Sequence, residues 1–489
     1  MIASEALPFA KTGGLADVVS ALPQALGRLG HRVTVVLPKY PQSRDVQGGT
    51  AMERFRVTVG GFTREAGFVE FPQGPNTRAI LVDVPELYDR EALYGVGNVD
   101  YPDNARRFAF LARAALEFAG RSDQRWDVLH AHDWQGGLAP VYLKTLFASH
   151  PHIATVASVF TIHNLAYQGL FPAELMPALD LGWDLFTPEK LEFWGQISFL
   201  KGGINFSDKI TTVSRKYAAE IQTVEYGSGF EGVLRRRAAD LVGITNGIDQ
   251  DVWDPARDRF VPQLYSAADL SGKRTAKQEV LRSFGLSTSE TTMLRPLVGM
   301  ISRMVDQKGF DLLADAADEL PGLDATFVLL GTGDPRYEKL WTGLALRYPD
   351  RIGVRIGFDE RLAHLIEAGA DIFLMPSRFE PCGLNQMYSL RYGTVPVVRA
   401  TGGLHDTVKD YDPRTGAGTG FTFQEYTSAA LLRALRRALD TYRKPAQWQR
   451  LQAEGMRQDH SWDASAREYV KIYERAVSAS RPATVRREA

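Results

Sequence analysis

Apolar residues along the chain follow two alternating patterns. Short runs rich in β-branched residues recur, and many are separated by stretches in which apolar residues return at the helical period. The runs are 33–37, 128–131, 156–162, 210–213, 298–301, 327–330, 372–375 and 395–398. Continuously apolar strands need a covering layer on each face, and their alternation with helices is typical of parallel βαβ units. The pattern therefore predicts an α/β fold with doubly wound sheets.

The first helical stretch follows a basic turn that contains a pair of glycines. Apolar residues from Leu15 to Leu29 have helical spacing, and Lys11, Gly13 and Gly14 come directly before them. Adjacent glycines allow a ligand to approach the backbone, and a helix N-terminus offers unpaired N–H groups and the positive end of its dipole. The sequence allows either an anion-binding turn or a plain tight turn. Asp17, in the first helical turn, suits the helix dipole without any ligand.

The length of the chain predicts more than one domain. A chain of 489 residues exceeds what one hydrophobic core usually serves. A polar connection rich in Gly and Pro near residues 240–260 suggests a boundary. The predicted division is 1–242 and 243–455 for two Rossmann-like domains, 456–480 for a C-terminal helix packing on the first domain, and 481–489 for a polar tail.

Charge and cysteine content narrow the class of protein. The 57 basic and 58 acidic side chains nearly cancel, which argues against a nucleic-acid partner or a membrane-surface binder. Cys382 is the single cysteine, so no intramolecular disulfide or thiolate metal cluster can form, as is usual in a reducing compartment. No signal-like segment or run of about 18 apolar residues is present. We expect a cytoplasmic protein without a membrane partner.

Polar residues follow several of the predicted strands. In open α/β sheets, ligands bind beyond the carboxyl ends of the strands. The residues at these ends are His132 and Asp133, His163 and Asn164, Ser302 and Arg303, and 377–380. A metal site is not expected, because successive residues of the run from His130 to Asp133 alternate between the two faces of a strand and no third ligand follows at a recognisable spacing.

Two loops of the second half carry candidate chemistry. Arg303 and Lys308 lie five positions apart, which suits a two-pronged cationic grip on phosphate oxygens or, equally, an ordinary solvated loop. Glu380 lies between two prolines. Its carboxylate can fix sugar hydroxyls, or it can complement the dipole of the helix that follows. Cys382 reads as a small packed residue in preference to a nucleophile. Thr401 and Gly402 begin a second turn with a glycine pair, Gly402 and Gly403.

Six blocks in order along nearly the whole chain resemble bacterial glycogen synthase and plant starch synthase. They begin at Lys11 (KTGGL), His130 (HAHDWQ), Phe160 (FTIHNLAYQG), Thr245 (TNGID), Arg303 with Lys308, and Ser377 (SRFEPCGLNQ). The resemblance implies a GT-B fold, in which two Rossmann-like doubly wound domains face each other across a deep cleft. The first domain would be the starch synthase catalytic type on the acceptor side, and the second would bind the nucleotide-sugar donor.

The reaction implied by the resemblance is transfer of glucose from ADP-glucose to the non-reducing end of glycogen or another α-1,4-glucan. ADP leaves, the anomeric configuration is retained, and no metal or other cofactor is required. The implied catalytic residues are Asp133, His163, Arg303, Lys308 and Glu380. The implied substrate-binding residues are Lys11, Gly13, Gly14, Asp17, Asn164, Asn246, Phe358, Cys382, Gly383, Leu384, Thr401 and Gly402.

Within these sets the resemblance implies distinct roles. Lys11 with the two glycine amides would face the donor diphosphate, and Arg303 with Lys308 would hold the phosphates as ADP leaves. Asp133 and His163 would line the glucose pocket. The carboxylate of Glu380 would bind the sugar together with the amides of the following glycine and leucine.

The chain departs from the family pattern at two places. Phe358 stands where relatives more often carry a tyrosine that stacks on adenine, so the hydroxyl is lost and the stacking face is kept. Relatives usually carry further residues before Ile2 that form the rest of a central first strand, so either the start is misassigned or that strand is short.

Two other functions are compatible with much of this pattern. One is a related transferase that uses UDP-glucose or makes a small disaccharide, and comparing turnover of the two donors separates them. The other is a non-catalytic glucan-binding protein, against which the intact candidate set argues. A phosphorylase is disfavoured because nothing marks a pyridoxal phosphate lysine. The sequence makes no prediction of oligomeric state.

Overall fold

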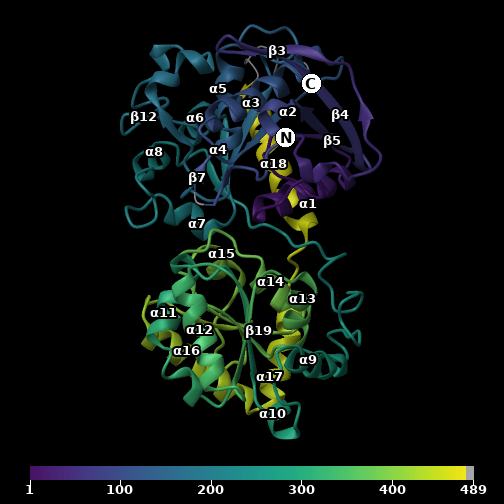
Figure 1. Cartoon of the computed structure of the whole chain (residues 1–489), viewed down its shortest axis with the longest axis vertical. Coiled ribbons are helices and arrows are strands. Elements are labelled where there is room, and N and C mark those ends of the chain that lie inside the picture. The colour runs from purple at the N-terminus through teal and green to yellow at the C-terminus, as the bar shows by residue number, and fades with distance from the viewer. Residues whose placement is uncertain (98, 481–489) are drawn as a thin grey trace. The chain divides into compact units, whose positions relative to one another are not determined.

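The computed structural model describes residues 1–97 and 99–480, and these form two compact units (Figure 1). The first unit contains residues 1–213 and 218–244 and the C-terminal segment that begins at Trp462. The second contains residues 214–217 and 245–461. The chain therefore passes to the second unit and returns to the first. The predicted tail, 481–489, lies outside the described residues.

The first unit is built on a largely parallel sheet in two groups of strands. One group has the order β14-β13-β9-β8, all parallel. The other has the order β1-β5-β4-β2, in which only β1 and β5 are parallel. The bounds are β1 (Val33–Pro38), β2 (Thr50–Ala51), β4 (Phe62–Gly74), β5 (Thr77–Asp83), β8 (Val128–His132), β9 (Ala157–Ile162), β13 (Lys209–Thr212) and β14 (Leu241–Gly243).

A very short N-terminal strand joins the two groups. Ile2 forms parallel bridges to Val36 of β1 and to Ala131 of β8. Its N–H donates to the carbonyl of His130 at 2.8 Å, and its carbonyl accepts from the N–H of His132 at 3.0 Å. With this segment as strand one, the parallel strands from β5 to β13 have the 3-2-1-4-5-6 order of a Rossmann sheet, and β14 extends it at the edge. The short central strand expected from the sequence is thus present as a single bridged residue.

Helices cover both faces of this sheet (Figure 1). They are α1 (Gly14–Arg28), α2 (Pro85–Tyr88), α3 (Asn104–Arg121), α4 (Asp133–Gly136), α5 (Leu138–Lys144), α6 (Phe199–Phe206), α7 (Arg215–Glu220, whose first residues belong to the second unit), α8 (Glu231–Arg236) and α18 (Trp462–Ser480). The last of these packs on α1 and β9. Trp462, Tyr469 and Ile472 share one buried cluster with Leu22 and Val159. The helix begins at Trp462, later than the predicted 456, because 445–456 forms a separate helix in the second unit.

Antiparallel pieces flank the first sheet. The strand β3 (Phe55–Val59) pairs with β4 as a hairpin. A separate three-stranded sheet has the order β10-β12-β11, with bounds β10 (Leu170–Pro172), β11 (Glu192–Phe193) and β12 (Gln196–Ser198). A two-stranded ribbon joins β6 (Gly95–Val96) and β7 (Val99–Asp100). The long strand β4 did not stand out in the sequence, because its few buried residues lie among partly and fully exposed ones instead of forming a long apolar run.

The second unit has one six-stranded parallel sheet with the order β17-β16-β15-β18-β19-β20. Its strands are β15 (Leu297–Ile301), β16 (Thr326–Gly331), β17 (Ile352–Ile356), β18 (Ile372–Met375), β19 (Val395–Arg399) and β20 (Phe421–Phe423). In chain order this is again 3-2-1-4-5-6, so the order reverses between β15 and β18. Both units are therefore Rossmann-like, and the predicted doubly wound α/β fold is confirmed.

Helices on both faces of the second sheet bury two separate cores. The helices are α9 (Ser271–Ser283), α10 (Glu290–Leu294), α11 (Phe310–Asp315), α12 (Pro335–Arg347), α13 (Glu360–Gly369), α14 (Asn385–Arg391), α15 (Gly402–Thr407), α16 (Ser428–Tyr442) and α17 (Pro445–Met456). One core contains Phe327, Trp341 and Leu435. The other contains Val328 and Leu365. Neighbouring residues of β16 thus point to opposite faces, which explains its continuous apolar run.

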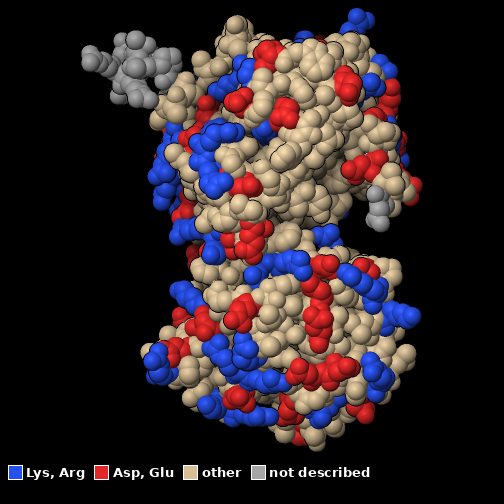
Figure 2. Space-filling model, turned by 90° about the vertical axis from the view of Figure 1, so that its left-hand side faces the viewer, with Lys and Arg blue, Asp and Glu red and all other residues tan. Residues whose placement is uncertain are grey.

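The surface and the helices add two facts. Basic and acidic side chains are mixed over the face shown in Figure 2. Within residues 1–97 and 99–480, no helix has the length and apolarity needed to cross a bilayer.

Candidate functional site

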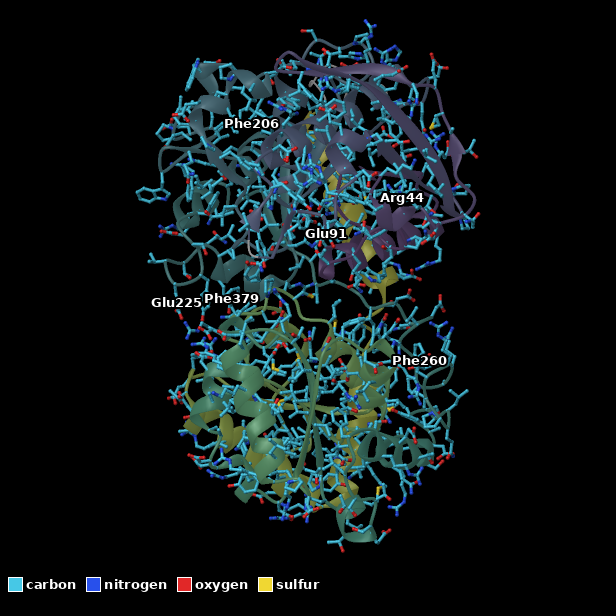
Figure 3. All side chains as sticks on the ribbon, in the orientation of Figure 1. Arg44, Glu91, Phe206, Glu225, Phe260 and Phe379 are labelled. Atoms are coloured by element: carbon cyan, nitrogen blue, oxygen red, sulfur yellow. The ribbon has the colours of Figure 1, made fainter. Side chains whose placement is uncertain are left out.

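The second unit gathers candidate residues at the point where its strand order reverses. The strand β15 leads into the loop with Arg303 and Lys308, and the neighbouring β18 leads into the loop with Glu380. Figure 3 labels Phe379 in that second loop, at the end of the unit where α15 lies in Figure 1. Because crevices form at such reversals, this is where the fold predicts a ligand.

A lysine and a glutamate are paired at this position. The ammonium Nζ of Lys308 lies 2.6 Å from Oε2 of Glu380, and the hydroxyl of Ser377 donates to the same oxygen at 3.1 Å. The Glu380 side chain is only 7% exposed, and that of Lys308 is 22% exposed. Among the described residues, Oε1 of Glu380 has no hydrogen-bond partner, so one carboxylate oxygen is left for a ligand.

Arg303 differs from Lys308 in its surroundings. It is exposed, and within the described part of the chain no acidic side chain pairs with it. A guanidinium that no protein carboxylate neutralises is available to an anion. The structure thus brings Arg303, Lys308 and Glu380 to one edge of one sheet.

A side-chain hydrogen bond and a close approach of the backbone hold the two loops together. The side-chain amide of Asn385 donates to the carbonyl of Ile301 at 3.0 Å, which ties the start of α14 to the end of β15. Gly309 has φ of 81°, and a Cβ there would lie 2.2 Å from the carbonyl oxygen of Pro376. Only glycine allows this close approach. The Lys308 loop and the Glu380 loop are therefore positioned as one piece.

The predicted glycine pair of α15 supports the same loop. A Cβ at Gly402, where φ is 45°, would lie 1.9 Å from the carbonyl oxygen of Glu380. The N–H of Gly403 donates to that carbonyl at 3.0 Å. Thr401 is buried directly before the pair. The absence of a side chain at Gly402 thus allows the backbone of Glu380 to lie where it does, a role that the sequence did not indicate.

Cys382 and Asn246 meet beneath this loop. Burial raises the pKa of the Cys382 thiol to about 12, so it is protonated at neutral pH, although the backbone N–H of Asn246 donates to it. A thiol in that state is a poor nucleophile, which supports the packed role. The side-chain oxygen of Asn246 is buried and has no partner among the described residues. Gly383, with φ of 72°, and Leu384 then lead into α14.

Phe358 lies further along the same sheet edge. It follows the outer strand β17 and is 90% exposed. The next residue, Asp359, caps α13 by accepting the N–H of Leu362 at 2.9 Å. The phenyl ring therefore offers an open face on a well-anchored turn.

In the first unit, the glycine turn is organised by a glutamate that the sequence analysis missed. The carboxylate of Glu5, 3% exposed, accepts the hydroxyl of Thr12 at 2.6 Å and the N–H of Gly13 at 3.3 Å. It also accepts the hydroxyl of Tyr94. The Gly13 amide therefore donates to Glu5, a contact that the sequence analysis did not predict.

The rest of the turn remains open. A Cβ at Gly13 or Gly14 would meet no atom within 4 Å, so protein packing does not require glycine there. The N–H groups of the first helical turn have no partner within their helix. Lys11 and Asp17 form an ion pair at 2.6 Å beside them.

Asp133 occupies a strained position at the end of β8. Its φ of 49° lies in the left-handed region, which only a few per cent of residues other than glycine adopt. Its Oδ1 accepts the N–H of His163 at 2.7 Å, and the N–H of Asn164 also donates to its carboxylate. Burial nonetheless raises the pKa of Asp133 to about 7. The structure thus joins Asp133, His163 and Asn164, which the sequence placed only on adjacent strand ends.

A pair of neutral histidines completes this group. Nδ1 of His132 lies 3.0 Å from Nε2 of His163. Burial lowers the pKa of His163 to about 3 and lowers that of His132 well below its ordinary value. Neither ring carries a charge at neutral pH, so His163 can hydrogen-bond but supplies no cation.

A three-ring stack in the second unit also escaped the sequence analysis. The indole of Trp253 lies between the rings of His364 and Tyr388, with centroid distances of 3.7 and 3.9 Å and interplanar angles of 10°. Asp258 accepts hydrogen bonds from His364 at 2.7 Å and from Tyr392 at 2.6 Å. The stack joins α13, which follows Phe358, to α14, which follows Leu384. No local pattern signals such a contact, because its members are far apart in sequence.

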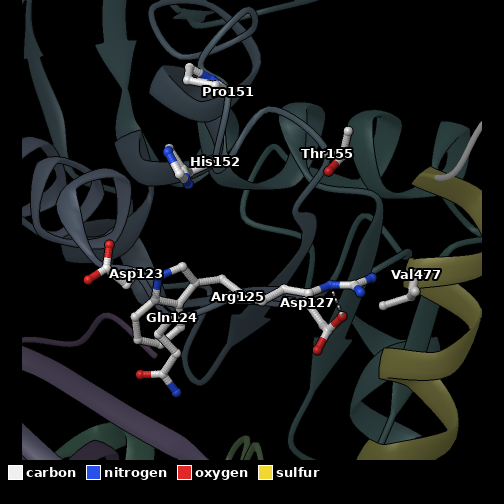
Figure 4. A pocket seen from close by; sticks show the side chains of 9 residues that line it. Asp123, Gln124, Arg125, Asp127, Pro151, His152, Thr155 and Val477 are labelled. Atoms are coloured by element: carbon white, nitrogen blue, oxygen red, sulfur yellow. Dashed lines mark ion pairs between the residues drawn. The ribbon is translucent and has the colours of Figure 1, made fainter.

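A cavity of the first unit lies away from these residues. It has a volume of about 300 Å³ and lies at the amino ends of β8 and β9 (Figure 4). Asp123, His152 and Thr155 line it, together with an ion pair between Arg125 and Asp127 at 3.6 Å. None of the candidate residues is among its lining residues, and it is at the sheet edge opposite to the one where α/β folds bind ligands.

Comparison with known proteins identifies the family of the chain. The starch synthase catalytic domain model matches residues 1–236, and the model of glycosyl transferases group 1 matches 289–453. A glycogen synthase of Koribacter versatilis is 49% identical over 483 residues, covering 99% of each chain.

Two solved structures are similar in fold. The catalytic domain of starch synthase IV from Arabidopsis thaliana, bound to ADP and acarbose, is 36% identical and covers 98% of each chain with a TM-score of 0.89. Sucrose-phosphate synthase from Thermosynechococcus elongatus, at 17% identity, also covers 98% of each chain, with a TM-score of 0.61, and supports the GT-B fold alone. On this evidence the chain belongs to the glycogen and starch synthase family of glycosyltransferases.

Proposed function

We propose that this enzyme transfers glucose from ADP-glucose to the non-reducing end of an α-1,4-glucan such as glycogen, releases ADP and retains the anomeric configuration. The observation that carries the proposal is the grouping of Arg303, Lys308 and Glu380 at the strand reversal of the second unit. Two cations beside a carboxylate with one free oxygen suit a ligand that joins a diphosphate to a sugar.

In this proposal the cations act on the leaving group. As the glycosidic bond to the donor breaks, negative charge develops on a phosphate oxygen. Lys308 is held by Glu380 at 2.6 Å and is therefore oriented before reaction, whereas Arg303 is unpaired within the described residues and can adjust to the phosphate. Preorganised charges of this kind stabilise a transition state more than mobile water does. We therefore propose that ADP departs without the help of a divalent metal.

Taken by itself, the first unit offers groups that suit a sugar and a phosphate. Asp133 and the neutral imidazole of His163 can accept or donate hydrogen bonds to hydroxyl groups. The open turn after Lys11 would contribute its free first-turn amides to phosphate oxygens. The Asp133 carboxylate is not assigned as a covalent nucleophile here.

The base of the donor would rest on Phe358. A ring that is 90% exposed on a capped turn can stack on a planar base. Stacking alone does not distinguish adenine from uracil strongly, so the choice of ADP-glucose over UDP-glucose rests on the family. UDP-glucose is the alternative donor to test.

The decisive experiment measures nucleotide release. Purified protein is mixed with ADP-glucose and glycogen, in parallel with UDP-glucose and with an acceptor-free control, all in excess chelator. Acceptor-dependent release of ADP, insensitive to chelator, is the expected result. Nucleotide release from UDP-glucose alone would show that UDP-glucose, and not ADP-glucose, is the donor. Glycogen binding without any nucleotide release would support a non-catalytic glucan-binding protein.

A further inference from the structure

An exposed tryptophan forms the turn between β11 and β12. Trp194 is 81% exposed and has φ of 52°, and the next residue, Gly195, has φ of 77°. Two-residue hairpin turns with two positive φ values strongly favour Asn, Asp and Gly. A bulky aromatic residue at the first position is an outlier, and such outliers point to function. Neither packing nor turn geometry accounts for tryptophan here.

The indole is anchored at one edge. Phe193 packs on Phe230 with ring centroids 4.2 Å apart and contacts Trp194 edge-on at 6.1 Å. A Cβ at Gly229 would lie 3.4 Å from Nε1 of Trp194, so the indole edge rests near that loop. Two buried phenyl rings thus support the turn while most of the indole surface faces water.

A second exposed tryptophan belongs to the same part of the unit. Trp183 is 56% exposed and lies two residues before Leu185, whose carbonyl accepts the N–H of Leu191 at 3.1 Å. The small sheet that carries Trp194 lies on the side of the first unit opposite β4 and β5 (Figure 1). Figure 3 labels Glu225 at that side, on the loop that leads to Gly229.

Hydrogen bonds connect this region to the segment that leaves the candidate site. The hydroxyl of Ser198, at the end of β12, donates to the carbonyl of Gln168 at 3.0 Å. The side-chain amide of Gln168 donates to the carbonyl of Ser228, in the loop beside Trp194, at 3.0 Å. Gln168 is five positions after His163. Hydrogen bonds therefore connect the turn at Trp194 to the segment that follows His163, although Trp194 is not among the sugar-binding residues proposed above.

We propose that Trp194, assisted by Trp183, is a binding platform for the α-glucan acceptor, separate from the point of glucose transfer. This inference rests on the proposed function. One face of a glucopyranose ring is lined with C–H groups and stacks on an indole, while the hydroxyl groups at its rim can bond to nearby polar groups such as Glu192 and Gln196. A polymer held at a second point reaches the transfer site at a higher effective concentration.

The test uses a substitution that suits the turn. In W194N the asparagine accepts the positive φ, so folding is preserved and the melting temperature does not fall. We expect the KM for glycogen to rise at least about fivefold more than the KM for maltotriose, a short acceptor that gains little from being held at a second point. W194F should restore most of the glycogen affinity. Retardation of each variant in a glycogen-containing native gel measures binding without turnover.

The controls separate this inference from the proposed function. L346A removes an equally exposed side chain, 79% exposed on α12, and should leave both KM values unchanged. Equal glycogen KM and equal gel retardation for W194N and the unaltered enzyme would overturn the platform. An exposed tryptophan without a role in glucan binding would then suit a contact with a protein partner. Equal losses with glycogen and maltotriose would also overturn it. If the unaltered enzyme released no nucleotide yet its gel retardation depended on Trp194, the proposed function would fail and the glucan platform would stand.

Discussion

The contact between Lys308 and Glu380 determines how the candidate phosphate site can work. A lysine held at 2.6 Å by a buried carboxylate keeps its charge in one place, but it also has two further N–H donors for a ligand. The neighbouring Arg303 has no such restraint among the described residues. We infer that Lys308 fixes where the diphosphate binds and that the side chain of Arg303 moves to contact the bound diphosphate.

Replacing Lys308 tests this assignment. K308A removes one preorganised charge from the leaving group, and such losses typically cost about 2.7–4 kcal/mol of barrier. We expect kcat for ADP release to fall about a hundredfold or more, with little change in melting temperature. The matched control is K339A, an exposed lysine of α12, which should behave as the unaltered enzyme. Activity within a few fold in K308A would contradict the role.

Asp133 predicts a pH-dependent stability. Burial raises its pKa from an ordinary 3.8 to about 7, so the folded protein binds this proton more tightly than the unfolded chain does. The stability contribution of Asp133 therefore decreases as pH rises from about 4 to about 7. D133N does not titrate. We expect the melting temperature of D133N minus that of the unaltered protein to increase between pH 5 and pH 8.

The comparison requires an aspartate outside the site. D123N, at an exposed position, should show a melting-temperature difference that is flat over the same range. A flat difference for D133N as well would mean that Asp133 is not held in a destabilising environment. D133N should also lose transferase activity at every pH, because the candidate site loses its carboxylate.

At the scale of elements, the stack around Trp253 connects α13 and α14. Each of these helices begins just after a residue that is proposed to contact the nucleotide sugar. The indole packs on His364 of α13 and Tyr388 of α14, and these helices begin just after Phe358 and Leu384. Trp253 touches no proposed ligand position itself. It is a positioning residue, which sets the spacing of the two helix N-termini.

W253L should therefore alter donor binding more than chemistry. We expect the KM for ADP-glucose to rise about tenfold, because small displacements of binding groups are costly, while kcat changes less. W253F, which retains a stacking ring, should be intermediate. W448F is the control, since Trp448 packs on Tyr442 in the same unit and should change the melting temperature without changing KM. A parallel loss of stability and of kcat in W253L, with KM unchanged, would point to a merely structural role.

The elements that the sequence predicted share one property. Each of the eight apolar runs forms a strand, because strands buried on both faces are continuously apolar. The strand β5 was missed although Ile80, Leu81 and Val82 are buried. Several other strands that it missed are half-exposed or at an edge. In β17, for example, Ile352 is buried and Ile356 is 41% exposed, so no run is visible. The helix α1 was predictable because its apolar residues recur on one face.

At the scale of the whole molecule, the chain order makes the first unit depend on the C-terminal helix. Trp462, Tyr469 and Ile472 of α18 are buried against residues of α1 and β9. Arg28 and Asp463, 435 positions apart, form an ion pair at 2.6 Å. The apolar faces of α1 and β9 would be exposed to water without this helix.

A fragment comparison tests this dependence. Residues 1–244 alone should fail to melt cooperatively, since large buried side chains such as Trp462 each contribute about 3–5 kcal/mol. The same fragment joined by a flexible linker to residues 457–480 should recover a cooperative transition. Circular dichroism and thermal melts distinguish the two. Cooperative melting of 1–244 at the temperature of the fusion would show that α18 is dispensable for that unit.

The sequence by itself determined the local elements, the doubly wound class and the candidate residues at strand ends, because these depend on periodicity and on residues near one another in the chain. Only the tertiary structure decided which of them meet. Lys308 and Glu380 are 72 positions apart and pair because β15 and β18 are neighbours at the strand reversal. The roles of Glu5, Gly402 and Trp253 likewise come from contacts between distant segments. Such contacts arise from sheet order and packing, and no local pattern encodes them.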